Sequence, residues 1–174
     1  MKRSTERILT THCGSLPRPK DLLDMMKAKV DGQAYDPDAF AKRVRSAVAE
    51  SVRRQVESGI DVPTDGEQGK TGFFAYVNER LTGFEPKPDR PFTLFAAEVK
   101  AFPEYYKQYF SQAMLGGTVA RVVPMACTGP VSYRGQEALH RDLDNLKAAL
   151  SGVTCEEVFV PAVAPSGVGA NEYY

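Results

Sequence analysis

The sequence has few of the residues from which metal centres and disulfide frameworks are built. Its 174 residues include two histidines and three cysteines. An odd number of widely spaced cysteines argues against a disulfide framework and favours reduced thiols. A tetrahedral zinc site needs about four ligands at compatible spacing, and no H-x-C, C-x-x-C or H-E-x-x-H motif occurs. We therefore expect this chain to bind no metal.

The sequence also lacks an excess of one charge and a long apolar run. Lys plus Arg and Asp plus Glu both number 22, so no overall field attracts nucleic acid or an anionic membrane. The apolar runs fall far short of a bilayer span, and "ILTT" is too brief for the apolar part of a signal peptide. We expect a cytoplasmic protein with a small neutral or zwitterionic partner, without nucleic acid or membrane.

What is present is an alternation of short apolar runs with helical patterns. The clearest helix covers residues 36–58, where Asp36 suits the N-cap, Pro37 the first helical position and Gly59 the C-terminal cap. Such alternation predicts an α/β fold with parallel strands and helical crossovers, either a small open sheet or a piece of a larger fold. Strands are expected within residues 7–15, 59–64, 120–127 and 156–165, and further helices within 19–30, 72–81, 102–114 and 135–152.

Four loops follow the predicted strands and are rich in Gly, Ser, Thr and Pro: "THCGSLPRP", "TDGEQGKTG", "CTGPVSYRG" and "APSGVGANEYY". Loops at the carboxyl ends of parallel strands form ligand-binding rims. The second loop is not a phosphate loop, because Thr64 stands where that motif needs its first glycine. Glu67 in this loop is either a ligand for a substrate ammonium group or a solvated turn residue.

The first loop begins with adjacent histidine and cysteine residues. In an extended segment His12 and Cys13 point to opposite faces, so they cannot easily chelate one ion. His12 either holds the loop by a hydrogen bond or acts in catalysis, and Cys13 would need a nearby base to be a nucleophile. Gly14 and Ser15 can offer backbone N–H groups and a hydroxyl to a carboxylate. His12 and Asp65 are further candidate pocket residues, and no catalytic residue is assigned.

An aromatic stripe at helical spacing has two interpretations. It could stack a flat ligand such as a pterin, but this spacing favours packing in the core. Its members are Phe102, Tyr105, Tyr106, Tyr109 and Phe110.

Taken in order, the opening stretch, "GIDVPTDGEQGKTGFFAYVNERLTGFE", "CTGPVSY" and "AVAPSG" resemble the cobalamin-independent methionine synthase family. The similarity is greatest to its single-domain homologues, within the wider group that includes uroporphyrinogen decarboxylases. The resemblance implies a (β/α)8 TIM barrel, of which residues 1–174 would form the N-terminal portion with about the first four strands.

The resemblance also implies a zinc-dependent methyltransferase, which moves a methyl group from a methyltetrahydropteroylglutamate to the thiol of homocysteine. The family's homocysteine-contacting segment matches Cys13, Gly14 and Ser15, and its amino-group-binding glutamate matches Glu67. The family's zinc ligands lie in the later half of the barrel and have no counterpart in this sequence. Zinc is thus expected for the complete barrel, whereas this chain alone is expected to bind none and to be inactive.

One departure from the family pattern leaves the acceptor thiol open. Where the family carries an Asp-Glu-Pro sequence whose aspartate contacts homocysteine, this chain has Val160, Pro161 and Ala162. Alkyl transfer to another thiol, as in epoxyalkane:coenzyme M transferases, is therefore one alternative. The other is a non-catalytic half-barrel that binds a small molecule, forms a homo-oligomer or pairs with a complementary barrel half.

Overall fold

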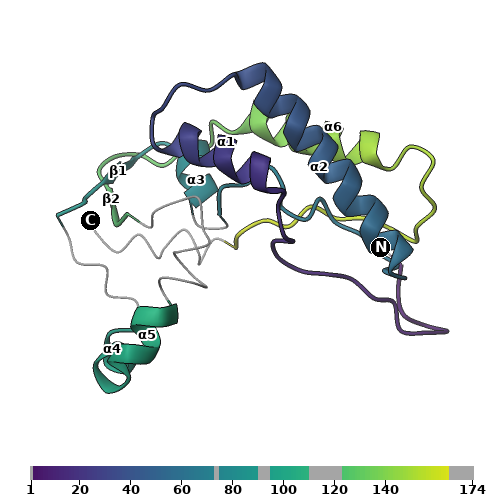
Figure 1. Ribbon diagram of the computed structural model, residues 1–174, viewed down its shortest axis with the longest axis horizontal. Helices are drawn as coiled ribbons and strands as arrows, with labels where there is room; N and C mark the ends of the chain where they lie inside the picture. Colours follow the sequence, from purple (N-terminus) through teal and green to yellow (C-terminus); the bar gives the residue numbers. More distant parts are fainter. Residues whose placement is uncertain (1, 73–74, 90–94, 110–122, 165–174) are drawn as a thin grey trace. The chain divides into compact units, whose positions relative to one another are not determined.

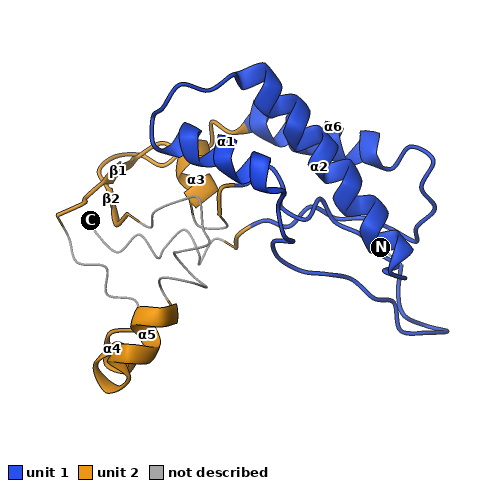
Figure 2. Ribbon diagram, in the orientation of Figure 1, with its two compact units in different colours: residues 1–70, 136–162 blue, residues 71–135, 163–174 orange. Residues whose placement is uncertain are grey.

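The computed structural model describes residues 2–72, 75–89, 95–109 and 123–164, which form a mixed α/β structure (Figure 1). The chain divides into two compact units, residues 1–70 with 136–162 and residues 71–135 with 163–174 (Figure 2). Among the described residues, no helix is both long enough and apolar enough to cross a membrane.

Three helices build the core of the first unit. Helix α2 (Pro37–Glu57) packs against α1 (Lys20–Val30) and α6 (Gln136–Ala149) (Figure 1). Their apolar sides meet as the helical spacing predicts, although Leu139 of α6 is exposed. The buried apolar side chains are Leu22 and Met26 of α1, Val44, Ala47, Val48 and Val52 of α2, and Leu146 and Ala149 of α6.

Helix α2 begins and ends where its sequence predicts. The Asp36 side chain accepts hydrogen bonds from the N–H groups of Asp38 and Ala39, as an N-cap does. At the other end Gly59 has φ 84° and donates its N–H to Val56, while Ile60 donates to Gln55. This pair of bonds is a Schellman motif, which turns the chain out of the helix toward the segment that carries Thr64.

Three segments of the first unit run parallel to one another, each paired through a single bridge. Thr11 pairs with Val62, and Thr64 pairs with Phe159. These residues lie in three of the predicted strands, so the predicted parallel neighbours are confirmed at these positions. The paired stretches are shorter than predicted, because prolines such as Pro63 have no N–H group to extend a ladder.

The described residues of the second unit form three short helices and a two-stranded antiparallel ribbon. The helices are α3 (Ala75–Arg80), α4 (Ala96–Ala101) and α5 (Pro103–Tyr109). Strand β1 (Phe84–Pro86) pairs with β2 (Met125–Cys127) in an antiparallel register that aligns Phe84 with Cys127. The predicted third strand is therefore confirmed as a strand at residues 125–127, but its partner there is an antiparallel neighbour.

The aromatic stripe of α5 does not pack in the core, and that prediction is wrong. Phe102 and Tyr105 are 64% and 60% exposed, and neither α4 nor α5 has a buried residue in its described part. The rings contact one another instead, as in the stacked pair of Tyr105 and Tyr109. The two helices are short and pack together, so neither presents a face to a core. Phe110 lies outside the described residues.

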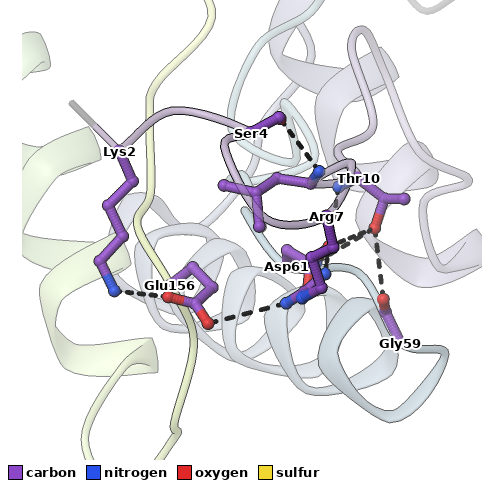
Figure 3. A network of polar contacts seen from close by, with 8 residues as sticks. Lys2, Ser4, Arg7, Thr10, Gly59, Asp61 and Glu156 are labelled. Atoms are coloured by element: carbon purple, nitrogen blue, oxygen red, sulfur yellow. Dashed lines mark hydrogen bonds and ion pairs between the residues drawn. The ribbon is translucent and has the colours of Figure 1, made fainter.

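Within the first unit, a polar network centred on Asp61 ties the N-terminal segment to residues 59–61 and 156 (Figure 3). The Asp61 carboxylate accepts hydrogen bonds from the Arg7 guanidinium at 2.5 and 2.8 Å and from the Thr10 N–H at 2.8 Å. Arg7 also lies 3.6 Å from Glu156, which pairs with Lys2. The bonds from Arg7 and Thr10 hold the pKa of the Asp61 carboxyl well below its usual range.

This network predicts a dependence of stability on pH. Because the pKa of Asp61 is lower in the folded state than in the unfolded chain, its stabilising contribution is present above pH about 4 and is lost as pH falls further. Urea unfolding curves between pH 6 and 2.5 should therefore show a smaller loss of stability for Asp61→Asn than for the unmodified chain. Asp24→Asn, at an exposed position of α1, is the control, and an unchanged pH profile in Asp61→Asn would contradict the prediction.

Candidate functional site

Two of the predicted loops meet in the first unit. The Ser15 hydroxyl donates a hydrogen bond to the Glu67 carboxylate at 2.5 Å, although these residues are 52 positions apart. Next to this bond, the Leu16 N–H donates to the Gly66 carbonyl at 3.0 Å, and the Gln68 amide donates to the Leu16 carbonyl at 3.2 Å. The structure thus brings together Ser15 and Glu67, two of the residues proposed from sequence to bind substrate.

Glu67 stands in an unusual backbone conformation inside this contact. Its φ of 54° lies in the left-handed region, which non-glycine residues adopt only when their surroundings hold them there. The residue is only 6% exposed, and its N–H donates to the Asp65 carboxylate at 3.0 Å. The carboxylate of Glu67 has lone pairs beyond the one that Ser15 uses, so it can accept a further hydrogen bond from a ligand.

Asp65, a candidate pocket residue, is buried beside Glu67. Burial raises the pKa of the Asp65 carboxyl, and the positive charge of Lys70 opposes this shift. Asp65 holds the backbone of Glu67 through the bond from the Glu67 N–H. In this position its carboxylate stabilises the turn.

Two cations hold the second loop, the buried Lys70 and the half-buried Arg18, and neither was assigned a role from the sequence. The Arg18 Nη2 donates to the carbonyl of Glu67 at 2.8 Å and to that of Lys70 at 2.7 Å. The Lys70 ammonium in turn donates to the carbonyl of Pro161. Burial lowers the pKa of Arg18, which Glu67 and Asp65 counteract. The sequence offered little indication of these contacts, because a cation that binds a main-chain carbonyl can have any type of residue as its partner.

The Gln55 side chain of α2 closes the end of the segment that leads into the loop. Its Oε1 accepts from the Thr64 N–H at 3.0 Å, and its Nε2 donates to the Thr64 carbonyl at 2.9 Å. Thr64 is fully buried. The Gln55 side chain supplies its N–H and carbonyl with the hydrogen bonds that a neighbouring strand would otherwise make. Its position three residues after Val52, on the apolar side of α2, was a signal that could have identified it.

Gly66 lies beside Ser51 of α2. Its φ is 61°, and a Cβ atom at this position would lie 2.4 Å from the Ser51 hydroxyl oxygen and 3.3 Å from Leu16. A glycine is therefore required both by the backbone conformation and by the space.

The other predicted residues of the first loop, His12, Cys13 and Gly14, directly precede Ser15. Cys13 is exposed, and Gly14 has φ 101°. His12 lines a cleft of about 510 Å³ together with Arg18, Gln68 and one side of α2, whereas Ser15 and Glu67 are not among the described residues that line it. The third predicted loop belongs to the second unit, and most of the fourth lies outside the described residues.

The described part of the chain offers no set of ligands for zinc. Among its residues, no group of three or more His, Cys, Asp or Glu side chains could hold a metal ion. The thiols of Cys13, Cys127 and Cys155 are free. The described residues therefore do not supply the set of donor atoms that zinc requires, and we assign no chemical step to a metal here.

Comparisons with known proteins agree with the fold. Residues 8–92 match the family described as "Cobalamin-independent synthase, Catalytic domain". A B12-independent methionine synthase from Shewanella sp. W3-18-1, solved in complex with selenomethionine, superposes with a TM-score of 0.55 at 18% identity. The match covers 94% of this chain and 40% of that one. The chain therefore has an α/β fold that corresponds to part of a (β/α)8 barrel, which confirms the predicted fold class.

The curated relatives are methionine synthases of archaea. The protein from Thermococcus kodakarensis is 34% identical over 168 residues, which cover 95% of this chain and 41% of the relative. Those from Pyrococcus furiosus and Sulfolobus acidocaldarius are 36% and 40% identical over 76 residues, 44% of this chain and 22% of each relative. The chain thus spans less than half the length of these relatives. The family match, the similarity along nearly the whole chain and the shared fold thus make this chain similar to the cobalamin-independent methionine synthase family.

Proposed function

We propose that this chain binds the amino-acid thiol that accepts the methyl group in a reaction of the methionine synthase type. In this proposal, the Glu67 carboxylate receives the ammonium group of homocysteine. The observation that carries it is the contact between Ser15 and Glu67, which joins the two motifs that the family resemblance assigns to this substrate. A buried carboxylate forms a charge-assisted hydrogen bond with an ammonium group, and such bonds are among the strong ones.

The exposure of the neighbouring residues is consistent with a site that a ligand can enter from solvent. Ser15 and Cys13 are exposed, whereas Glu67 is buried beneath the first loop. In the proposal, Cys13, Gly14 and Ser15 line the approach, and their backbone N–H groups face the carboxylate of the substrate. His12 stays a candidate for the wider pocket because of the cleft that it lines.

The reaction that we propose for the complete protein is a transfer of a methyl group from a folate to sulfur. A bond forms between the homocysteine sulfur and the methyl carbon, and the bond between that carbon and the folate nitrogen breaks. The thiol loses a proton and the folate nitrogen gains one, so that the reaction balances. The family resemblance implies zinc for this reaction, and its ligands would have to lie outside the described residues. We further propose that residues 1–174 form one portion of the barrel, inactive alone, in a cytoplasmic protein.

A second acceptor is favoured by one observation. The segment that contains Val160, Pro161 and Ala162 reaches this site, because the Lys70 ammonium binds the Pro161 carbonyl, but those three residues bring no acid. A thiol without an ammonium group, such as coenzyme M, would need fewer acidic partners. A pairing with a complementary barrel half, or with a second copy, is compatible with either acceptor.

Substitution of Glu67 tests the leading proposal. Glu67→Gln keeps the shape of the side chain but removes its charge, so we expect L-homocysteine to bind more weakly by about 1.5–3 kcal/mol, about 10- to 150-fold. Calorimetric titration of the 174-residue chain under reducing conditions measures this difference. Glu137→Gln, at an exposed position on α6, is the matched control. An unchanged affinity, or tighter binding of coenzyme M than of homocysteine, would contradict the proposal.

A further inference from the structure

We propose that Arg18 is a positioning residue, which holds Glu67 in the orientation needed to bind its ligand. This inference rests on the proposed role of Glu67. A single nitrogen of Arg18, Nη2, donates to the carbonyls of both Glu67 and Lys70, at 2.8 and 2.7 Å. Arg18 therefore binds the main chain at both ends of the turn that carries the Glu67 carboxylate.

The turn needs such a partner because of its own geometry. Glu67 has φ 54°, and the Lys70 N–H donates back to the Glu67 carbonyl at 3.1 Å. This conformation directs the carbonyls of Glu67 and Lys70 toward one point, where their negative ends repel one another. A cation at that point offsets the repulsion and stabilises a backbone conformation that is otherwise unfavourable.

Arg18 acts together with Ser15, three residues earlier in the same loop. Ser15 binds the carboxylate of Glu67, and Arg18 binds its carbonyl. Residue 67 is thus held from one loop at its side chain and at its main chain. Because both ends are held, rotation about the bonds between them is restricted, and the free lone pairs of the carboxylate keep one direction.

The charges around Arg18 agree with a role in this turn. Arg18 is half-buried, and the carboxylates of Glu67 and Asp65 oppose the lowering of its pKa by this burial. The cation is therefore balanced by the residues that it orders. An arginine suits the position because its charge persists on burial and its planar donors have a fixed direction.

The experiment compares Arg18→Met with the unmodified chain by two measurements. Amide hydrogen exchange followed by NMR should become at least about tenfold faster at Leu16 and Lys70, which bond within the two loops, and should stay unchanged at Val48 and Val52 in α2. The dissociation constant of L-homocysteine should rise about 5- to 50-fold. Arg45→Met, at an exposed position of α2, is the control for loss of a positive charge.

Arg18→Lys keeps the test decisive if the methionine variant does not fold. An ammonium can also donate to two carbonyls, so this variant should recover part of the protection at Lys70 and part of the affinity. Faster exchange throughout α2, unchanged exchange at Leu16 and Lys70, or faster exchange there with unchanged affinity would each overturn the role of Arg18. If the unmodified chain binds no homocysteine, the proposed function fails, and the exchange at Lys70 still decides whether Arg18 holds the turn.

Discussion

Replacement of Gln55 by leucine is expected to lower the free energy of unfolding by about 2–5 kcal/mol. The Gln55 side chain binds both the N–H and the carbonyl of Thr64, and the two residues are 5% and 0% exposed. Leucine fits the size of the site but leaves these two backbone groups buried and without this partner. Each buried polar group that loses its hydrogen bond costs about 1–3 kcal/mol. Urea unfolding followed by circular dichroism measures the difference.

The control for this prediction is Lys42→Leu, at an exposed position of the same helix. It should change the free energy of unfolding by no more than about 0.5 kcal/mol, as is usual for surface sites. If Gln55→Leu costs less than about 1 kcal/mol, the bonds to Thr64 contribute little to stability. The second loop would then depend on its other contacts.

Gly66→Ala is expected to destabilise the protein by about 2–4 kcal/mol. Part of this cost is backbone strain, because φ at Gly66 is 61°. The rest is steric, because the added Cβ would lie 2.4 Å from the Ser51 hydroxyl oxygen. The same unfolding measurement applies.

A matched pair of variants separates the two causes. Gly32 has a similar φ of 67° but no atom within 4 Å of an added Cβ, so Gly32→Ala should show only the backbone strain. Addition of Ser51→Ala to Gly66→Ala removes the clashing oxygen and should recover part of the lost stability. Equal costs for Gly66→Ala and Gly32→Ala would show that the close approach of α2 to the loop has no energetic weight.

Features that depend on neighbouring residues in the sequence could be predicted. The bounds of α2 followed from Asp36, Pro37 and Gly59, whose cap bonds involve residues within a few positions. The antiparallel ribbon of β1 and β2 could not be predicted in the same way, because its pairing joins residues about 40 positions apart. The exposure of Tyr105 also escaped prediction, since helical spacing shows which residues share a face and not whether another element covers it.

The candidate site was predictable where it matches motifs of a known family. Ser15 and Glu67 were proposed because they match the family's substrate-binding motifs, whereas residue type alone left Glu67 open between a ligand and a solvated turn residue. Arg18 binds the carbonyl of Glu67, 49 positions away, and Lys70 binds the carbonyl of Pro161, 91 positions away. Every residue has a main-chain carbonyl, so the sequence does not show which carbonyl a cation will bind. Only the folded backbone brings those oxygens to the cations.

The bond from Lys70 to the Pro161 carbonyl has a consequence for which substitutions residues 160–162 can accept. Every amino acid carries that oxygen, so this anchor does not constrain which side chain occupies position 161. Under the proposed function, exchange of the side chains at residues 160–162 is expected to alter which thiol is preferred while Lys70 keeps its main-chain partner. The side chains of this short segment can therefore vary while its main chain keeps the contact with Lys70.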